Sequence, residues 1–116
     1  MKTLFIKILI ITFVCLISLS NVFAENKIRI GLAVPLSGEF SEIGDSIIKS
    51  TRLALNKIND EKFEIVPEDT KANPIDTLKA SKTLYDQGIK IIIGPVFNES
   101  TKYLDELNDV TFISLT

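Results

Sequence analysis

The sequence of 116 residues contains no histidine and only one cysteine, Cys15. Without histidine, the protein has no imidazole to serve as a general base and no histidine ligand for zinc. A single cysteine excludes an intramolecular disulfide and a cysteine-rich metal cluster. The net charge of −2 provides no basic face for tracking phosphates, so we expect no nucleic-acid partner. The length gives room for one small domain at most.

Motifs for nucleotide cofactors and activated nucleophiles are also missing. Neither G-x-G-x-x-G nor G-x-x-x-x-G-K-[ST] occurs, so we expect no nucleotide cradle and no cofactor. Ser37 has no histidine and no nearby lysine to activate its hydroxyl. The acidic pairs Glu68-Asp69 and Asp105-Glu106 are typical of solvated surfaces, since adjacent residues point apart on a helix. The sequence therefore predicts that the protein is not an enzyme and holds no metal.

The first 24 residues differ from the rest of the chain, because they hold 17 apolar residues and no acidic one. Lys2 and Lys7 give this segment a positive start. The mostly apolar stretch 8–19 is shorter than the ~20 residues that a membrane-spanning helix needs. Val22 and Ala24 stand at −3 and −1 of a possible cleavage site. We predict that residues 1–24 are a signal peptide that is cut after Ala24; the alternative is an uncleaved anchor or a buried helix.

Cleavage would leave residues 25–116 as an exported protein without cysteine. Its net charge would change from −2 to −4, because the two lysines of the first segment are removed. A chain without thiols can fold in an oxidising compartment without mispairing them. Cys15 itself does not look like a lipid-anchor site, since Phe13 and Val14 precede it where small residues would be expected.

Residues 25–116 alternate between β-rich apolar runs and amphipathic helical runs. The predicted strands are 27–34, 63–66, 89–93 and 110–115, and the predicted helices are 43–59, 74–87 and about 98–107. With short connections, this order predicts right-handed crossovers and an α/β fold with a Rossmann-like, doubly wound parallel sheet. The run 89–93 is nearly all β-branched, which is typical of a central strand. Because the chain stops at a strand end, we expect a fragment of a longer protein.

Single residues predict where these elements begin and end. Pro35 and Pro67 should close the first two strands, since proline cannot donate to a ladder. Asn73 is a suitable N-cap, and Gly88 suits a left-handed helix stop. Asn98 is expected to cap the last, short helix. The predicted inner face of helix 74–87 comprises Ile75, Leu78, Ser81, Leu84 and Tyr85.

In a doubly wound sheet, ligands bind beyond the carboxyl ends of the strands, where the strand order reverses. The candidate ligand-binding residues at these ends are Ser37, Asn98, Ser100, Thr101, Ser114 and Thr116. A helix that begins near Asn98 would offer unpaired N–H groups and a positive dipole end to a carboxylate or phosphate group. The alternative is that Asn98 only caps the helix and that the hydroxyl groups face water.

Three runs of the sequence resemble a known family. IRIGLAVPLSGEFSEIGDSIIKSTRLALNKIN, at 28–59, resembles the opening of the periplasmic leucine/isoleucine/valine-binding proteins, which have the type I periplasmic binding fold. NPIDTLKASKTLYDQGIKIIIGP, at 73–95, and GPVFNESTKYLDELNDVTFISLT, at 94–116, resemble the segments that follow, including the ligand loop. Together, the runs cover nearly all of residues 27–116.

This resemblance implies a two-lobed receptor without enzymatic activity, in which residues 25–116 form part of the N-terminal lobe. It implies an exported, periplasmic component of an ABC transporter that binds a small solute such as a branched-chain amino acid. The partner would be an ABC permease in the inner membrane. In the amino-acid-binding members, a serine in the loop after the third strand holds the ligand carboxylate, and Asn98 stands at this place here.

A sister group with the same fold gives the alternative function. The GPVF run at 94–97 and the EDT run at 68–70 resemble the penicillin-binding-protein activators, which regulate cell-wall synthesis and are usually lipoproteins. This sequence has no convincing lipid-anchor motif. Under this alternative, the partner would be a penicillin-binding protein rather than a permease.

Overall fold

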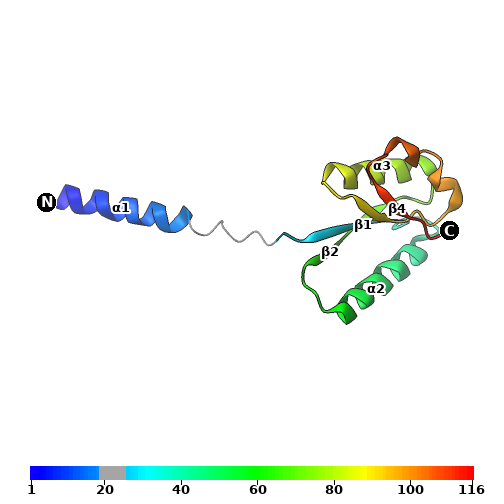
Figure 1. Cartoon of the computed structure of the whole chain (residues 1–116), viewed down its shortest axis with the longest axis horizontal. Helices are drawn as coiled ribbons and strands as arrows, with labels where there is room; N and C mark the ends of the chain where they lie inside the picture. The colour runs from blue at the N-terminus through cyan, green and yellow to red at the C-terminus, as the bar shows by residue number, and fades with distance from the viewer. Residues whose placement is uncertain (19–25) are drawn as a thin grey trace.

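The computed structural model describes residues 1–18 and 26–116 (Figure 1). Its elements are helix α1 (Lys2–Ser18), strand β1 (Ile28–Val34), helix α2 (Ser41–Ile58), strand β2 (Phe63–Asp69), helix α3 (Pro74–Asp86), strand β3 (Ile91–Ile93), the 3-10 turns η2 (Asn98–Thr101) and η3 (Leu104–Glu106), and strand β4 (Thr111–Ile113). The predicted cleavage position after Ala24 lies outside the described residues. None of the described helices is both long enough and apolar enough to cross a membrane.

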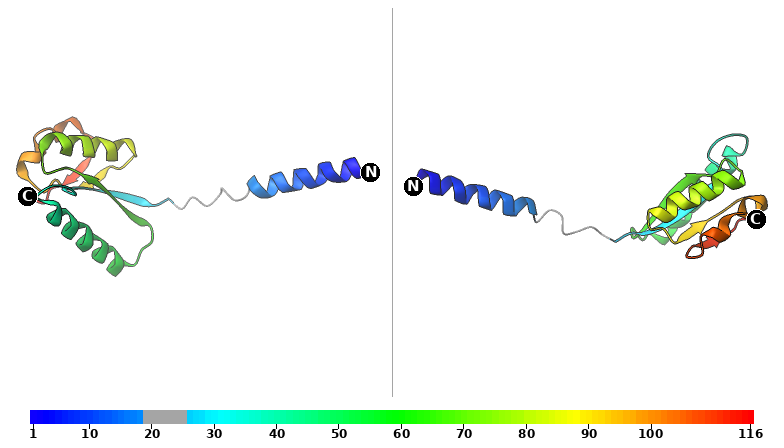
Figure 2. Two further views of the ribbon diagram at one scale, coloured as in Figure 1. Left: turned by 180° about the vertical axis from the view of Figure 1, so that it is seen from behind. Right: turned by 90° about the horizontal axis from the view of Figure 1, so that it is seen from above.

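The four strands form one parallel sheet in the order β2-β1-β3-β4. Helix α2 lies on one face of this sheet and α3 on the other, as seen from two sides in Figures 1 and 2. The chain moves outward from β1 to β2 and then returns past β1 to β3. The strand order therefore reverses between β1 and β3, which confirms the predicted doubly wound α/β fold.

The core lies between the sheet and α3. Leu84 of α3 is buried together with Ala33, Ile89 and Ile92. Gly31 makes this packing possible, because a Cβ atom there would lie 2.7 Å from Leu84 Cδ1. The core therefore fixes β1 and β3, the two strands on either side of the reversal point, against one helix.

The signals at the ends of α3 are confirmed. Asn73 Oδ1 accepts a hydrogen bond of 2.9 Å from the backbone N–H of Asp76, and Gly88 has a φ of +82°. Asn59 also ends α2 in the left-handed conformation, with a φ of 51°. The inner face of α3 is only partly as predicted. Ile75 is 72% exposed, and Thr77 and Ala80 are buried instead, because the buried stripe of α3 is rotated from the predicted one and runs along 77, 80, 81 and 84.

Two other expectations about element ends are wrong. Strand β2 continues through Pro67 to Asp69. Because β2 is an edge strand, its outer side has no neighbouring strand, so the N–H that Pro67 lacks is not needed there, and Pro67 pairs with Leu32 of β1 on the inner side. The predicted helix 98–107 is replaced by η2 and η3. In η2, the Thr101 hydroxyl donates to the carbonyl oxygen of Asn98 at 2.7 Å and so competes for a backbone acceptor of the helix.

The α2 side of the sheet is covered over β1 and β2 but less over β3 and β4. Helix α2 packs against β1 and β2. On its side of the sheet, Ile91, Ile113 and Leu115 remain 41–49% exposed. On α2 itself, Leu53 and Ile58 are more than half exposed. This side of the described fold therefore carries an open apolar surface.

Candidate functional site

Loops from three neighbouring strands meet at the carboxyl edge of the sheet. They follow β1 (residues 35–40), β3 (94–101) and β4 (114–116). Phe40 and Phe97 join the first two loops, since their ring centroids lie 5.0 Å apart in a tilted arrangement. The Leu115 N–H donates to the carbonyl oxygen of Pro95, which joins the last two loops. The candidate residues predicted from the sequence therefore share this edge.

Two glycines allow close backbone contacts at this edge of the sheet. A Cβ atom on Gly44, near the start of α2, would overlap the carbonyl oxygen of Pro35. Gly94 has a φ of +120°, and a Cβ atom there would overlap the carbonyl oxygen of Ala33. Both positions lie beside the point where the strand order reverses, and their lack of a side chain sets the shape of the edge.

Ser37 is held by a carboxylate of the neighbouring edge strand. Its hydroxyl donates to Asp69 Oδ2 at 2.6 Å. Asp69 Oδ1 accepts from the backbone N–H groups of Leu36, at 2.8 Å, and Lys71, at 2.9 Å. Burial alone would raise the pKa of Asp69, but these hydrogen bonds and the Ser37 backbone lower it below the ordinary value of 3.8. Asp69 is therefore an ionised anchor of the β1 loop.

The residues after β3 have different surroundings. Asn98 is exposed, and none of the described side chains caps η2, whose N-cap position is Phe97. The capping role expected for Asn98 is therefore wrong. Ser100 is only 2% exposed, where η2 packs against α3. Because η2 has four residues and 3-10 geometry, the predicted helix N-terminus with its aligned dipoles is not formed here.

Two of the candidate residues line a hollow beside η3. Thr101 and Ser114 line one hollow of about 310 Å³, together with Pro95, Leu104 and Phe112. Thr116 is exposed, and its N–H donates to Ser114 Oγ at 3.4 Å. Of the six candidates, Thr101 and Ser114 are thus brought into one hollow, whereas Ser37 belongs to the Asp69 cluster.

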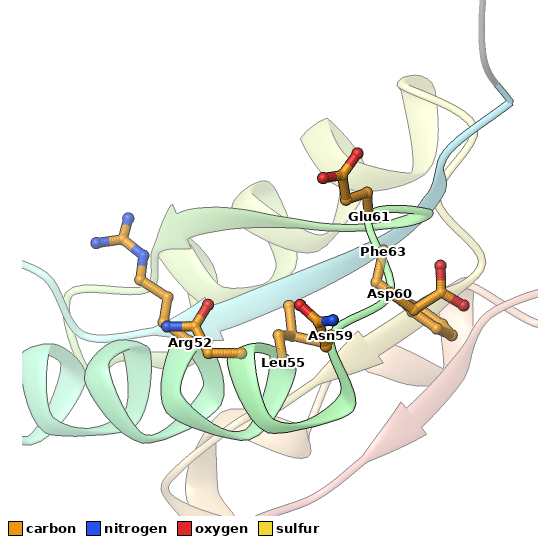
Figure 3. Close-up of a pocket in the computed structure, with 7 residues that line it drawn as sticks. Arg52, Leu55, Asn59, Asp60, Glu61 and Phe63 are labelled. Carbon is orange, nitrogen blue, oxygen red and sulfur yellow. The ribbon is translucent and has the colours of Figure 1, made fainter.

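Two larger hollows lie beside α2. One, of about 590 Å³, is lined mainly by apolar atoms and lies between the first half of α2 and the sheet, where Ile43, Ile47, Ile93 and Leu115 contribute. The other, of about 530 Å³, lies between the end of α2 and the start of β2 (Figure 3). It is lined by Arg52, Asp60, Glu61 and Phe63 among others. In the view of Figure 3, the guanidinium group of Arg52 and the carboxylate of Asp60 point away from each other. This second hollow is at the amino edge, away from the strand ends where such folds bind ligands.

Residues 27–115 match the family model described as periplasmic binding protein. The chain belongs to the periplasmic binding protein family. An uncharacterized protein of Methanocaldococcus jannaschii is 33% identical in an alignment of 86 residues that covers 67% of this chain and 21% of that protein. The chain therefore spans about a fifth of the length of this relative.

Solved periplasmic binding proteins have the same fold over this region. An ABC transporter substrate-binding protein from Sphaerobacter thermophilus superposes with a TM-score of 0.70 at 22% identity, over 76% of this chain and 26% of its own. A solute binding protein from Rhodopseudomonas palustris, in complex with 3,4-dihydroxybenzoic acid, gives a TM-score of 0.70 at 23% identity, over 78% of this chain and 27% of its own. The leucine-binding protein LivK from Thermotoga maritima gives a TM-score of 0.65 at 21% identity, over 75% of this chain and 27% of its own.

Sequence reasoning missed three residues of this edge. The residue pattern assigns Asp69 to a solvated acidic pair, and neither Phe40 nor Phe97 stands out in it. The position of Asp69 just after the predicted strand 63–66 is a usable signal. However, its contact with Ser37 depends on the pairing of Val34 with Asp69 in adjacent parallel strands. Such pairing between distant segments is not encoded in a local pattern.

Proposed function

We propose that the protein is the substrate-binding component of an ABC transporter and holds a small solute at the carboxyl edge of its sheet. The observation that carries this proposal is the family match over residues 27–115, combined with the loops that meet at the point of strand reversal. These loops carry exposed hydroxyl and amide side chains as well as the Phe40–Phe97 pair. Such a mixture suits a solute with one polar end and one apolar part.

The solute that we propose is a branched-chain amino acid or a similarly small acid. Two of the solved structures support this range, since one is a leucine-binding protein and the other holds 3,4-dihydroxybenzoic acid. We propose that Ser37, Asn98, Thr101, Ser114 and Thr116 provide polar contacts. Ser100 is a weaker candidate, because it is buried against α3 and would need to turn outward.

We also propose that the protein binds without catalysing a reaction. A serine nucleophile needs a base that can take its proton. The carboxylate that contacts Ser37 has a lowered pKa and is therefore a weak base. The Ser37–Asp69 contact suits the positioning of a loop rather than the activation of a hydroxyl.

In the complete receptor, residues 25–116 would supply part of the first lobe, and a second lobe would close over the solute. Export through residues 1–24 would bring the protein to the periplasm. There it would deliver the solute to an ABC permease of the inner membrane. These proposals follow from the family and from the apolar, acid-free N-terminal segment.

Isothermal titration calorimetry of the full-length protein tests this function. Leucine, isoleucine, valine and 3,4-dihydroxybenzoate are titrated separately up to millimolar concentration, and we expect saturable binding of at least one. Replacing Asn98 by Ala should weaken that binding about tenfold, the effect of one lost hydrogen bond of about 1.4 kcal/mol. Asn56→Ala, at the amino-edge hollow, is the matched control and should leave affinity unchanged. Absence of binding by all four compounds would contradict the proposed function.

A further inference from the structure

The hydrogen bonds around Asp69 fix the direction in which the Ser37 hydroxyl donates. An ionised carboxylate can only accept, so the 2.6 Å contact between Ser37 Oγ and Asp69 Oδ2 uses the single hydroxyl proton of Ser37. The other oxygen of Asp69 is occupied by the N–H groups of Leu36 and Lys71. The carboxylate therefore has a defined partner on each oxygen and holds the start of the β1 loop.

This arrangement leaves Ser37 with lone pairs but without a proton to give. Ser37 is exposed, so its oxygen can accept a further hydrogen bond from outside the protein. The negative charge of Asp69 directly behind it makes that oxygen a better acceptor. A ligand carboxylate, which has no proton to donate at neutral pH, would meet lone pairs and a negative charge at this point.

We propose that Asp69 is a positioning residue that turns Ser37 into a hydrogen-bond acceptor, so that the bound solute presents an N–H or O–H donor to the β1 loop. The inference rests on the proposed function and adds the orientation of the solute to it. The donor is an ammonium, amide or hydroxyl group. The acidic end of the solute is then directed away from the β1 loop, toward the loops after β3 and β4.

Asp69→Asn separates the two roles of this residue. In this variant, the amide oxygen of the new side chain can still accept from Leu36 and Lys71. The NH₂ group of the same amide would replace Oδ2 and donate to Ser37 Oγ, which frees the serine proton to point outward. Asp69→Ala removes both roles, and Ser37→Ala removes only the acceptor. Glu68→Gln, one position earlier on β2, is the matched control for loss of a negative charge.

The loop anchor is measured without any ligand, by amide hydrogen exchange of the full-length protein in NMR. The Leu36 and Lys71 amides should be protected in the wild type, in Glu68→Gln and in Asp69→Asn. In Asp69→Ala they should exchange at least about tenfold faster, because their shared acceptor is lost. Unchanged exchange in Asp69→Ala would overturn the anchoring role.

The direction of the hydrogen bond is measured with pairs of probes that differ in a donor group: leucine against 4-methylpentanoate, and 3,4-dihydroxybenzoate against benzoate. The wild type and Glu68→Gln should prefer the donor-bearing member of a pair about tenfold or more. Asp69→Asn and Ser37→Ala should each reduce that preference by about tenfold. An unchanged preference in both variants would overturn the inference, although the proposed function would stand. If no probe binds the wild type, the proposed function fails and the proposed solute orientation fails with it, while amide exchange still decides the anchoring role.

Discussion

Gly44 and Asp69 show how single residues shape the carboxyl edge by opposite means. Gly44 acts through the absence of a side chain, since the carbonyl oxygen of Pro35 occupies the space of a Cβ atom. Asp69 acts through its two oxygens, which collect hydrogen bonds from the β1 loop and from Lys71. Neither role could be predicted from the sequence, because both depend on segments that meet only in the folded sheet.

Gly44→Ala should destabilise the protein strongly. The new methyl group must displace the backbone of Pro35 or the start of α2, and overpacking of this kind costs about 3 kcal/mol or more. Gly38→Ala is the control: its φ of +78° makes it unfavourable as well, but no atom lies within 4 Å of the added Cβ. It should cost only about 1 kcal/mol. Urea unfolding followed by circular dichroism measures the free energy of unfolding of both variants. An equal loss of this free energy in the two variants would contradict the close contact at Gly44.

The stability contribution of Asp69 should depend on pH. Because its pKa is lowered in the folded protein, the stabilisation is complete above the ordinary value of 3.8, which applies to the unfolded chain, and is lost as pH falls through the lower folded pKa. Asp69→Asn can keep these hydrogen bonds but loses the charge that strengthens them, so it should be less stable than the wild type at pH 7, by about 1–2 kcal/mol, and the difference should shrink in acid. Urea unfolding at pH 7 and near pH 3 measures this. A difference that grows in acid would contradict the assigned hydrogen bonds.

Helix α3 is the element that the sequence predicts best, and its signals are local. The Asn73 cap, Pro74 in the first turn and the left-handed Gly88 all lie within a few residues of the ends that they set. The central position of β3 likewise followed from its run of isoleucines. The segment 98–107 was predicted wrongly because its apolar spacing suits a helix, whereas hydroxyl-to-backbone bonding favours 3-10 turns.

Ser81 should be replaceable by alanine without loss of stability. Its side chain is fully buried on the inner face of α3, and within the described residues its oxygen has no hydrogen-bond partner. Removing an unpaired buried hydroxyl should leave stability unchanged or raise it by up to about 1 kcal/mol. Thr77→Ala is the comparison, since the Thr77 hydroxyl donates to the carbonyl oxygen of Asn73 at 2.7 Å, and it should destabilise. Thermal unfolding that ranks Ser81→Ala below Thr77→Ala would be against this interpretation.

The predicted role of helix α1 in export can be tested in cells. Residues 1–24 should be removed on export, so the protein recovered from the periplasm of an expressing bacterium should begin at Glu25. N-terminal sequencing and intact mass measure this directly. Replacing Ala24 by a bulky residue should block processing, because signal peptidase needs a small side chain at −1. Recovery of the protein with Met1 or its neighbours intact, in the cytosolic fraction, would contradict the predicted signal peptide.

In the molecule as a whole, the family and the fold are more firmly defined than the solute. The order of the four strands and of the helices α2 and α3, with parallel pairing, follows from periodicity and short connections, and the sheet has this order and pairing. The ligand contacts are harder to predict, since they involve loop residues whose neighbours are set by the sheet order. Helix α2 has a regular apolar pattern, but part of its surface and the strand residues Ile91 and Ile113 remain exposed. The apolar pattern therefore predicts the helix but not how completely other elements cover it.

Binding of a small solute at the carboxyl edge of the sheet can be measured residue by residue. The experiment is a ¹H–¹⁵N NMR titration of the full-length protein with leucine and with 3,4-dihydroxybenzoate. We expect the amide shifts caused by at least one of these probes to cluster in residues 36–40, 94–101 and 114–116. Shifts confined to the amino-edge hollow around Arg52 and Phe63, or no shifts with either probe at millimolar concentration, would contradict binding at the carboxyl edge.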